Sequence, residues 1–154
     1  CALDANANHV MFCQISDGGN LGTCARAALG FGYENLALAR PCVDPFDPHV
    51  LRASMGAFFH LNARVYDSFD AYLQAFGTRE AYPFMLDGSV LLNEAARAAH
   101  APHTLVFGNE ATGLPASFAS LGQAVRIPHS DAIDSLNLAV AVSIAAYAFT
   151  ESSF

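Results

Sequence analysis

The sequence predicts a single α/β domain, with a mostly parallel sheet that carries helices on both faces. Short apolar runs alternate along the chain with segments of helical periodicity, and no repeat, low-complexity run or linker interrupts the 154 residues. Such alternation is typical of parallel sheets, because each crossover helix packs back onto the sheet. The apolar fraction of 53% against a charged fraction of 14% indicates a large core and excludes a disordered chain.

Glycine, proline and capping residues delimit the expected elements. Asn20 is the expected N-cap of the first helix and Gly30 its C-cap, Asp47 and Pro48 open the second helix, and Gly77 ends the third. Ser135 is the expected N-cap of the final helix. Strands are expected at residues 10–14, 36–39, 82–86, 104–107 and 125–127, and helices at 20–29, 48–53, 67–76, 91–100 and 135–149.

Composition and motif content indicate where the protein functions in the cell and exclude several kinds of ligand site. Four cysteines without a C-x-x-C pair favour reduced thiols in a cytoplasmic protein. The longest apolar stretch, residues 136–149, is too short to span a bilayer, and no signal peptide is evident, so no membrane partner is expected. The chain contains no P-loop, dinucleotide fingerprint or hydrolase elbow. A proline between His100 and His103 disrupts metal-ligand spacing, and no metal is expected.

Three segments, each after an expected strand, carry the functional signal. Residues 20–32 read NLGTCARAALGFG, residues 105–115 read LVFGNEATGLP, and residues 127–141 read IPHSDAIDSLNLAVA. Their order and content resemble the three motifs of the SpoU (TrmH-like) family of RNA ribose 2′-O-methyltransferases, in the SPOUT superfamily. The resemblance covers residues 10–147, which is almost the whole chain.

The resemblance implies properties that the residue pattern alone does not. It implies a trefoil knot in the carboxyl-terminal part of the sheet, S-adenosylmethionine as the cofactor, and a homodimer whose interface lies near the cofactor site. Knots are nearly absent among proteins, so pattern reasoning would not propose one. A final helix that is apolar nearly all round fits burial against a second copy, although enclosure by its own core is the alternative. The chain is interpreted as one methyltransferase domain, residues 1–154, without an amino-terminal RNA-binding extension.

The resemblance also assigns cofactor contacts. It places the adenosine moiety at Gly108, where a side chain would keep a ligand from the backbone. It places Leu86, Ile127 and Leu136 around the same moiety, and for each of these apolar residues the alternative is plain core packing. Ser135 is assigned a polar contact with the cofactor and the nucleophile.

The implied catalytic residues are Arg26, Asn20, Glu110, Ser135 and Asn137. Arg26 would lie beside the target ribose, stabilise the developing alkoxide and bind the adjacent phosphate, because a guanidinium rarely gives up a proton. Glu110 would orient Arg26 or the RNA. The alternatives are a surface arginine for Arg26 and helix capping for Ser135.

The net charge of −7 contrasts with the basic surface that usually marks RNA binding. The expected reaction is transfer of a methyl group to a ribose 2′-hydroxyl of tRNA or rRNA. Three alternatives stay open: a knotted methyltransferase that acts on a base nitrogen, a dimer that binds cofactor or RNA without turnover, and an unrelated α/β nucleotide-binding module.

Overall fold

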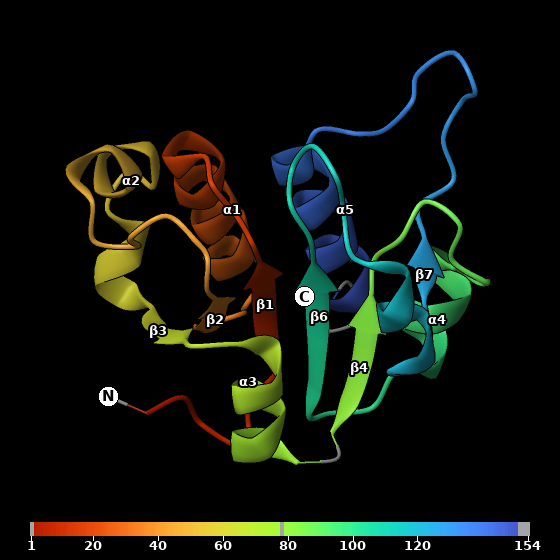
Figure 1. Cartoon of the computed structure of the whole chain (residues 1–154), viewed down its shortest axis with the longest axis horizontal. Coiled ribbons are helices and arrows are strands. Elements are labelled where there is room, and N and C mark those ends of the chain that lie inside the picture. The colour runs from red at the N-terminus through yellow and green to blue at the C-terminus, as the bar shows by residue number, and fades with distance from the viewer. Residues whose placement is uncertain (1, 78, 151–154) are drawn as a thin grey trace.

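A five-stranded parallel sheet forms the centre of the computed structural model, which describes residues 2–77 and 79–150 (Figure 1). The strand order is β3-β2-β1-β6-β4, so the chain builds outward from β1 in one direction and then crosses to the other side. The strands are β1 His9–Cys13, β2 Asn35–Ala39, β3 Asn62–Tyr66, β4 Glu80–Pro83 and β6 His103–Phe107. The parallel α/β architecture predicted from the sequence is confirmed.

Helices and a small second sheet surround the strands. Strands β5 and β7 pair in parallel beside the main sheet. The remaining elements are α1 Gly18–Gly30, α2 Pro48–Ala53, η1 Ala57–His60, α3 Phe69–Phe76, β5 Val90–Leu91, α4 Leu92–Ala98, η2 Ala116–Ser120, β7 Val125–Arg126 and α5 Leu138–Thr150. Within the described ranges, no helix has the length and hydropathy needed to cross a membrane.

Alternate side chains along the strands belong to two separate hydrophobic cores, one on each face of the sheet. Val10 and Phe12 of β1 belong to a large cluster that includes the buried faces of α1 and α5. Met11 points to the opposite face, where it belongs to a smaller cluster with Tyr72 of α3. Because side chains alternate across a strand, this division places helices on both faces of the sheet, as predicted.

The predicted caps of the first and last helices are wrong, α3 begins two residues later than expected, at Phe69, and α4 is shorter than expected. Asp17, not Asn20, caps α1, because its carboxylate accepts the backbone N–H of Asn20 at 2.8 Å. The helix continues through Gly30, and Phe31 is the C-cap. The last helix begins at Leu138, where Asn137 Oδ1 accepts the N–H of Ala139 at 2.9 Å, so Ser135 is not its N-cap.

The predictions for α2 and α3 are confirmed at Asp47 and Gly77. Strand β3 was not expected from the sequence, because this edge strand is partly exposed and does not form an apolar run. The trefoil knot stays a prediction.

A buried polar chain crosses the amino ends of the strands. The ring of His9 donates from Nε2 to the carbonyl of Asp4 at 2.8 Å and accepts at Nδ1 from the Tyr72 hydroxyl at 2.8 Å. Tyr72 in turn meets the hydroxyl of Thr104 at 2.7 Å. Burial, supported by the charge of Arg79, lowers the pKa of His9 to about 4, although the bond to Asp4 opposes this shift.

We expect this neutral histidine to make stability depend on pH. The unfolded chain binds a proton near the ordinary pKa of 6.5, whereas the folded chain does not until about pH 4. The contribution is therefore complete above pH 6.5 and is lost as the pH falls towards 4, by about 2–3 kcal/mol. Urea unfolding of the wild type and His9→Gln across this window should give curves that converge at low pH; parallel curves would contradict the assignment.

Candidate ligand site at the carboxyl ends of the strands

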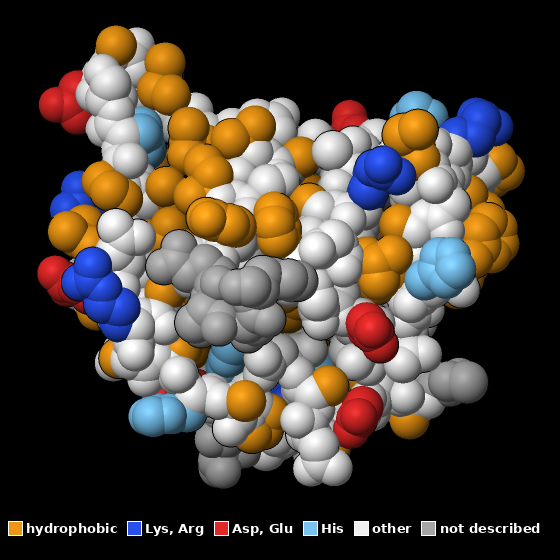
Figure 2. Space-filling model, turned by 180° about the vertical axis from the view of Figure 1, so that it is seen from behind, with side chains coloured by type: hydrophobic (Ala, Val, Ile, Leu, Met, Phe, Trp, Pro, Cys, Tyr) orange, Lys and Arg blue, Asp and Glu red, His pale blue; other side chains and the backbone are white. Residues whose placement is uncertain are grey.

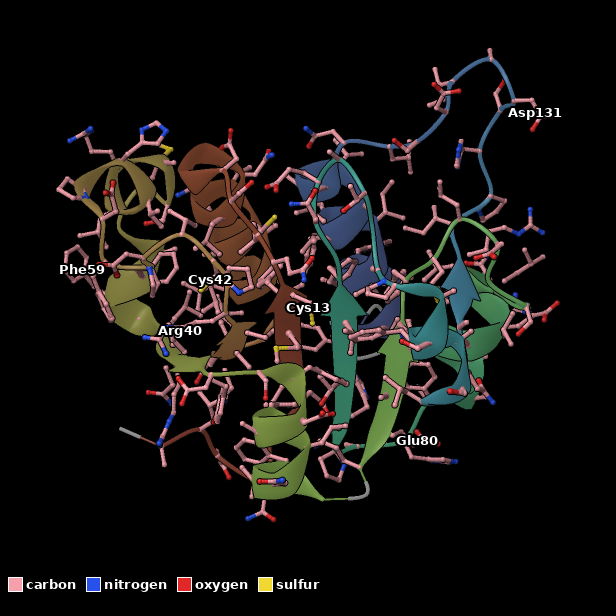
Figure 3. All side chains as sticks on the ribbon, viewed as in Figure 1. Cys13, Arg40, Cys42, Phe59, Glu80 and Asp131 are labelled. Atoms are coloured by element: carbon pink, nitrogen blue, oxygen red, sulfur yellow. The ribbon has the colours of Figure 1, made fainter. Side chains whose placement is uncertain are left out.

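A cavity of about 340 Å³ lies at the carboxyl ends of β4 and β6. Its walls come from residues 84–87 after β4, residues 107–114 after β6, and the 127–137 loop with the first turns of α5. The 127–137 loop projects beyond the body of the molecule before it returns to α5 (Figure 1), and Asp131 lies on its outer part (Figure 3). Ligands of open parallel sheets bind at this end of the strands.

The floor of the cavity depends on a tight turn at residues 108–114. A Cβ on Gly108 would lie 2.3 Å from the carbonyl carbon of Gly113 and 2.5 Å from the nitrogen of Leu114. Gly113 itself has a φ of +68°, which favours glycine. Asn109 Oδ1 accepts the backbone N–H of Ala111 at 2.8 Å and that of Thr112 at 3.1 Å, which closes the turn. Only glycine at position 108 allows the two halves of the turn to meet.

Glu110 joins this turn to the loop that precedes α1. Its carboxylate accepts the Ser16 hydroxyl at 2.8 Å and the backbone N–H groups of Ser16 and Asp17 at 3.1 and 3.2 Å. Burial alone would raise the pKa of Glu110, but these hydrogen bonds outweigh it and hold the pKa below its usual value. Glu110 is thus an ionised anchor between two loops, and its hydrogen-bond partners do not include Arg26.

The apolar residues predicted to contact a cofactor do line the cavity. Leu86 is 63% exposed, and Ile127 and Leu136 are half-buried, so none of the three is an ordinary core residue. Ser135 is exposed on the same wall. The cavity therefore brings together Leu86, Gly108, Glu110, Ile127, Ser135 and Leu136 from the predicted set.

Three predicted catalytic residues lie outside this cavity. Arg26 is exposed on α1 and lines a different hollow, with Met55 and His60. Asn20 lies in the first turn of α1, and Asn137 caps α5. Among the described residues, Arg26 therefore does not line the cavity that the second and third motifs form.

Sequence reasoning did not single out three polar cavity residues: Asp87, Asn109 and Thr112. His129 also lines the cavity, and its Nδ1 bonds to the carbonyl of Ile127 at 3.0 Å. For Asn109, the glycine-flanked turn in the second segment was the available signal. Asp87 follows a strand without any motif around it.

The chemistry of the lining selects among ligands. The described lining residues include the carboxylates of Asp87 and Glu110 but no lysine or arginine. Phosphate-rich ligands need cationic or N–H-rich sites, so this cavity favours a largely apolar ligand that carries positive charge. No group of three or more histidine, cysteine, aspartate or glutamate side chains suited to a metal occurs among the described residues.

Comparison with protein families shows that residues 7–147 match the model of the SpoU rRNA methylase family. The chain belongs to this family. Among solved structures, the AdoMet-bound rRNA methyltransferase of Sinorhizobium meliloti superposes with a TM-score of 0.88 and 29% identity. The superposition covers all of this chain and 59% of the Sinorhizobium chain. A structure from work on 2-OH methylation of C/U34 on tRNA gives a TM-score of 0.87 with 31% identity over 98% and 100% of the two chains.

Curated SpoU-family relatives are longer. An uncharacterised tRNA/rRNA methyltransferase of Synechocystis is 33% identical over 143 residues, which is 87% of this chain and 49% of the relative. The tRNA (cytidine/uridine-2′-O-)-methyltransferase TrmJ of Yersinia enterocolitica is 34% identical over 149 residues, which is 90% and 58% of the two chains. The chain therefore spans about half the length of the curated relatives it matches. The family assignment made from the three motifs is confirmed.

Removing the charge of Glu110 should loosen the link between the two loops. We expect Glu110→Gln to lower the free energy of unfolding by about 1–3 kcal/mol at pH 7, because charge-assisted hydrogen bonds are lost. Because the pKa of Glu110 is lowered, the difference from the wild type should shrink as the pH falls below its ordinary value of 4.5. The matched control is Glu34→Gln, because Glu34 is an exposed glutamate that follows the carboxyl end of α1. This change should leave the free energy of unfolding nearly unchanged in urea titrations.

Proposed function

We propose that this chain is an S-adenosylmethionine-dependent RNA methyltransferase domain that methylates a ribose 2′-hydroxyl of tRNA or rRNA. The observation that carries the proposal is the cavity at the carboxyl ends of β4 and β6, where the second and third family motifs meet around Gly108. The TrmJ relatives are named for 2′-O-methylation of cytidine and uridine in tRNA, and a structural neighbour was solved with AdoMet bound.

The cavity suits S-adenosylmethionine in shape and charge. The adenine ring would pack against Leu86, Ile127 and Leu136, and the bare backbone at Gly108 admits the adenosine closely. The sulfonium and ammonium charges of the cofactor match a lining that carries carboxylates and no arginine or lysine among its described residues. When bound, the cofactor supplies an electrophilic methyl group whose leaving group is a neutral thioether.

The chain's own task is to orient the ribose and to handle the hydroxyl proton. Alignment of a nucleophile with its target supplies several kcal/mol of the barrier reduction. Ser135 and Asn137 belong to the third motif, and we assign them polar contacts with the cofactor and the nucleophile. Asn20, beside the capping Asp17, is assigned to the same ribose.

Arg26 needs a second copy to reach this chemistry. The guanidinium is proposed to stabilise the developing alkoxide and bind the adjacent phosphate, yet it does not line the cavity of its own chain. A homodimer in which Arg26 of one copy faces the cavity of the other reconciles the two observations. The knot and a cytoplasmic location belong to the same proposal.

Helix α5 offers the surface for that dimer. Its buried face packs against α1, whereas Val140, Ile144 and Tyr147 are 47%, 38% and 53% exposed. These residues follow helical spacing and form one apolar stripe. Figure 2 shows hydrophobic side chains gathered on this back face of the molecule. Exposed apolar stripes of this kind mark contact surfaces between subunits.

Methyl transfer is tested with radiolabelled S-adenosylmethionine and unmodified tRNA or rRNA as separate acceptors. We expect label in a 2′-O-methyl nucleoside from one RNA pool, and a loss of about 100-fold or more for Arg26→Ala. Arg97→Ala, at an exposed arginine on α4, is the control and should keep full activity. A base-methylated nucleoside, or no binding of S-adenosylmethionine in calorimetry, would contradict the proposal.

Mixed dimers test whether Arg26 acts across the interface. A Cβ at position 108 collides with the 113–114 backbone, so Gly108→Ala should abolish cofactor binding while leaving its own Arg26 intact. Separately inactive Arg26→Ala and Gly108→Ala proteins, unfolded and refolded together, should recover activity through one complete site per heterodimer. No recovery, with heterodimers shown by mass spectrometry, would place Arg26 with its own cavity. Ile144→Glu should give monomers in sedimentation velocity, because it buries a charge.

A further inference from the structure

Methyl transfer to a ribose hydroxyl requires a group that accepts the hydroxyl proton. Arg26 does not suit this task, because a guanidinium stays protonated in proteins. The acceptor is therefore to be sought in the cavity at the carboxyl ends of β4 and β6, which we call the cofactor cavity. Its described lining contains two carboxylates, those of Asp87 and Glu110, and one imidazole, that of His129.

The carboxylate of Glu110 is already occupied by hydrogen-bond donors. It accepts the hydroxyl and the N–H of Ser16, the N–H of Asp17, and the side-chain amide of Asn109 at 3.0 Å. Burial would raise the pKa of Glu110, but these bonds outweigh burial and keep the group a weak base. The other carboxylate of the lining belongs to an aspartate, which is ordinarily a far weaker base than an imidazole. His129 is thus the lining side chain whose chemistry best suits proton transfer near neutral pH.

A hydrogen bond within the 127–137 loop fixes which nitrogen of His129 is free. Nδ1 of the ring lies 3.0 Å from the carbonyl oxygen of Ile127. Because a carbonyl oxygen only accepts, Nδ1 must carry the proton of this bond, and the neutral ring then has a bare lone pair at Nε2. The imidazole bases of serine hydrolases are oriented in the same manner, with one nitrogen donating to an oxygen and the other left to accept.

The backbone around His129 holds the residue between the cofactor cavity and solvent. Ile127 lines the cavity and packs against the large hydrophobic core, and Pro128 restricts the backbone between Ile127 and His129. After His129 the loop leaves the body of the molecule (Figure 1). His129 is half-buried, whereas residues 130–135 are all exposed. A proton taken up in the cavity can therefore pass on to water.

Given the proposed function, on which this step rests, we propose that His129 is the general base, with Nε2 accepting the proton of the ribose 2′-hydroxyl. The O–H bond breaks as the oxygen bonds to the methyl carbon, and the electron pair of the carbon–sulfur bond passes to sulfur, which leaves as a neutral thioether. Arg26 of the other copy keeps its proton and stabilises the oxygen. One positive charge disappears from sulfur while one appears on the imidazole ring, so the charge that faces Asp87 and Glu110 is conserved.

Single-turnover methylation separates this role from binding. With enzyme and S-adenosylmethionine in excess over unmodified tRNA or rRNA, we expect His129→Ala to lower the rate about 100-fold or more. His129→Gln should be equally slow, because its amide can still donate to the Ile127 carbonyl but cannot take up a proton. Both variants should keep the wild-type affinity for S-adenosylmethionine in calorimetry and the wild-type KM for RNA.

Chemical rescue distinguishes a proton acceptor from a structural contact. Free imidazole should raise the methylation rate of His129→Ala in proportion to the imidazole concentration, because the truncated side chain leaves room for an external base. The wild type and His129→Gln should not respond, since the position is filled in both.

His100→Gln is the matched control, because His100 is exposed and precedes β6 at the amino ends of the strands, outside the described lining of the cavity. It should methylate RNA as the wild type does. The assignment to His129 is overturned if either His129 variant methylates at the wild-type rate, if its loss lies in the affinity for S-adenosylmethionine, or if imidazole fails to restore His129→Ala. Each of these results leaves the proposed function standing. A wild type that binds S-adenosylmethionine but methylates neither RNA overturns the proposed function, and the base with it.

Discussion

The carboxylate of Glu110 is the connection on which the arrangement of the cofactor cavity depends. It receives the Ser16 hydroxyl and the N–H groups of Ser16 and Asp17, and so ties the turn after β6 to the loop after β1. Asp17 also caps α1, which means that one short loop both starts that helix and holds the cavity turn. Any shift of α1 is thereby transmitted to the Gly108 turn. The geometry of the ligand site and the position of the helix that carries Arg26 are consequently coupled.

The distribution of charge explains how an acidic chain can serve the proposed RNA reaction. The cofactor cavity presents Asp87 and Glu110, which suit a cationic methyl donor and disfavour a polyanion. The opposite side of α1 presents Arg26 and Arg52 without acidic neighbours in the described hollow. In the proposed dimer, this cationic side of one copy faces the acidic cavity of the other, and the net charge of −7 says little about either surface.

The sequence was sufficient for the fold class and the family, because periodicity and motif order are properties of the chain itself. The structure also brings Leu86, Gly108, Ile127, Ser135 and Leu136 to one cavity, since their segments follow strands whose ends meet at one edge of the sheet. Their contacts with a cofactor stay predictions. Within one copy of the chain Glu110 bonds to Ser16 and Asp17 rather than to Arg26, and sequence alone does not reveal this contact because Ser16 lies 94 residues away. Its expected role towards the RNA stays a prediction. Asp17 and Asn20 lie within one turn of each other, and either side chain is suited to be the N-cap of α1. Only tertiary contacts decide which of the two caps the helix.

The two ends of the sheet differ in what their polar groups do. At the amino ends, His9, Tyr72 and Thr104 satisfy one another in the core, and the Tyr33 hydroxyl meets His103 Nε2 at 2.8 Å. Buried networks of this kind rigidify a fold when every member has a partner. At the carboxyl ends, glycine and half-buried apolar side chains leave open space instead. Because the network closes one end of the strands, the other end can keep a cavity and strained turns without loss of the fold.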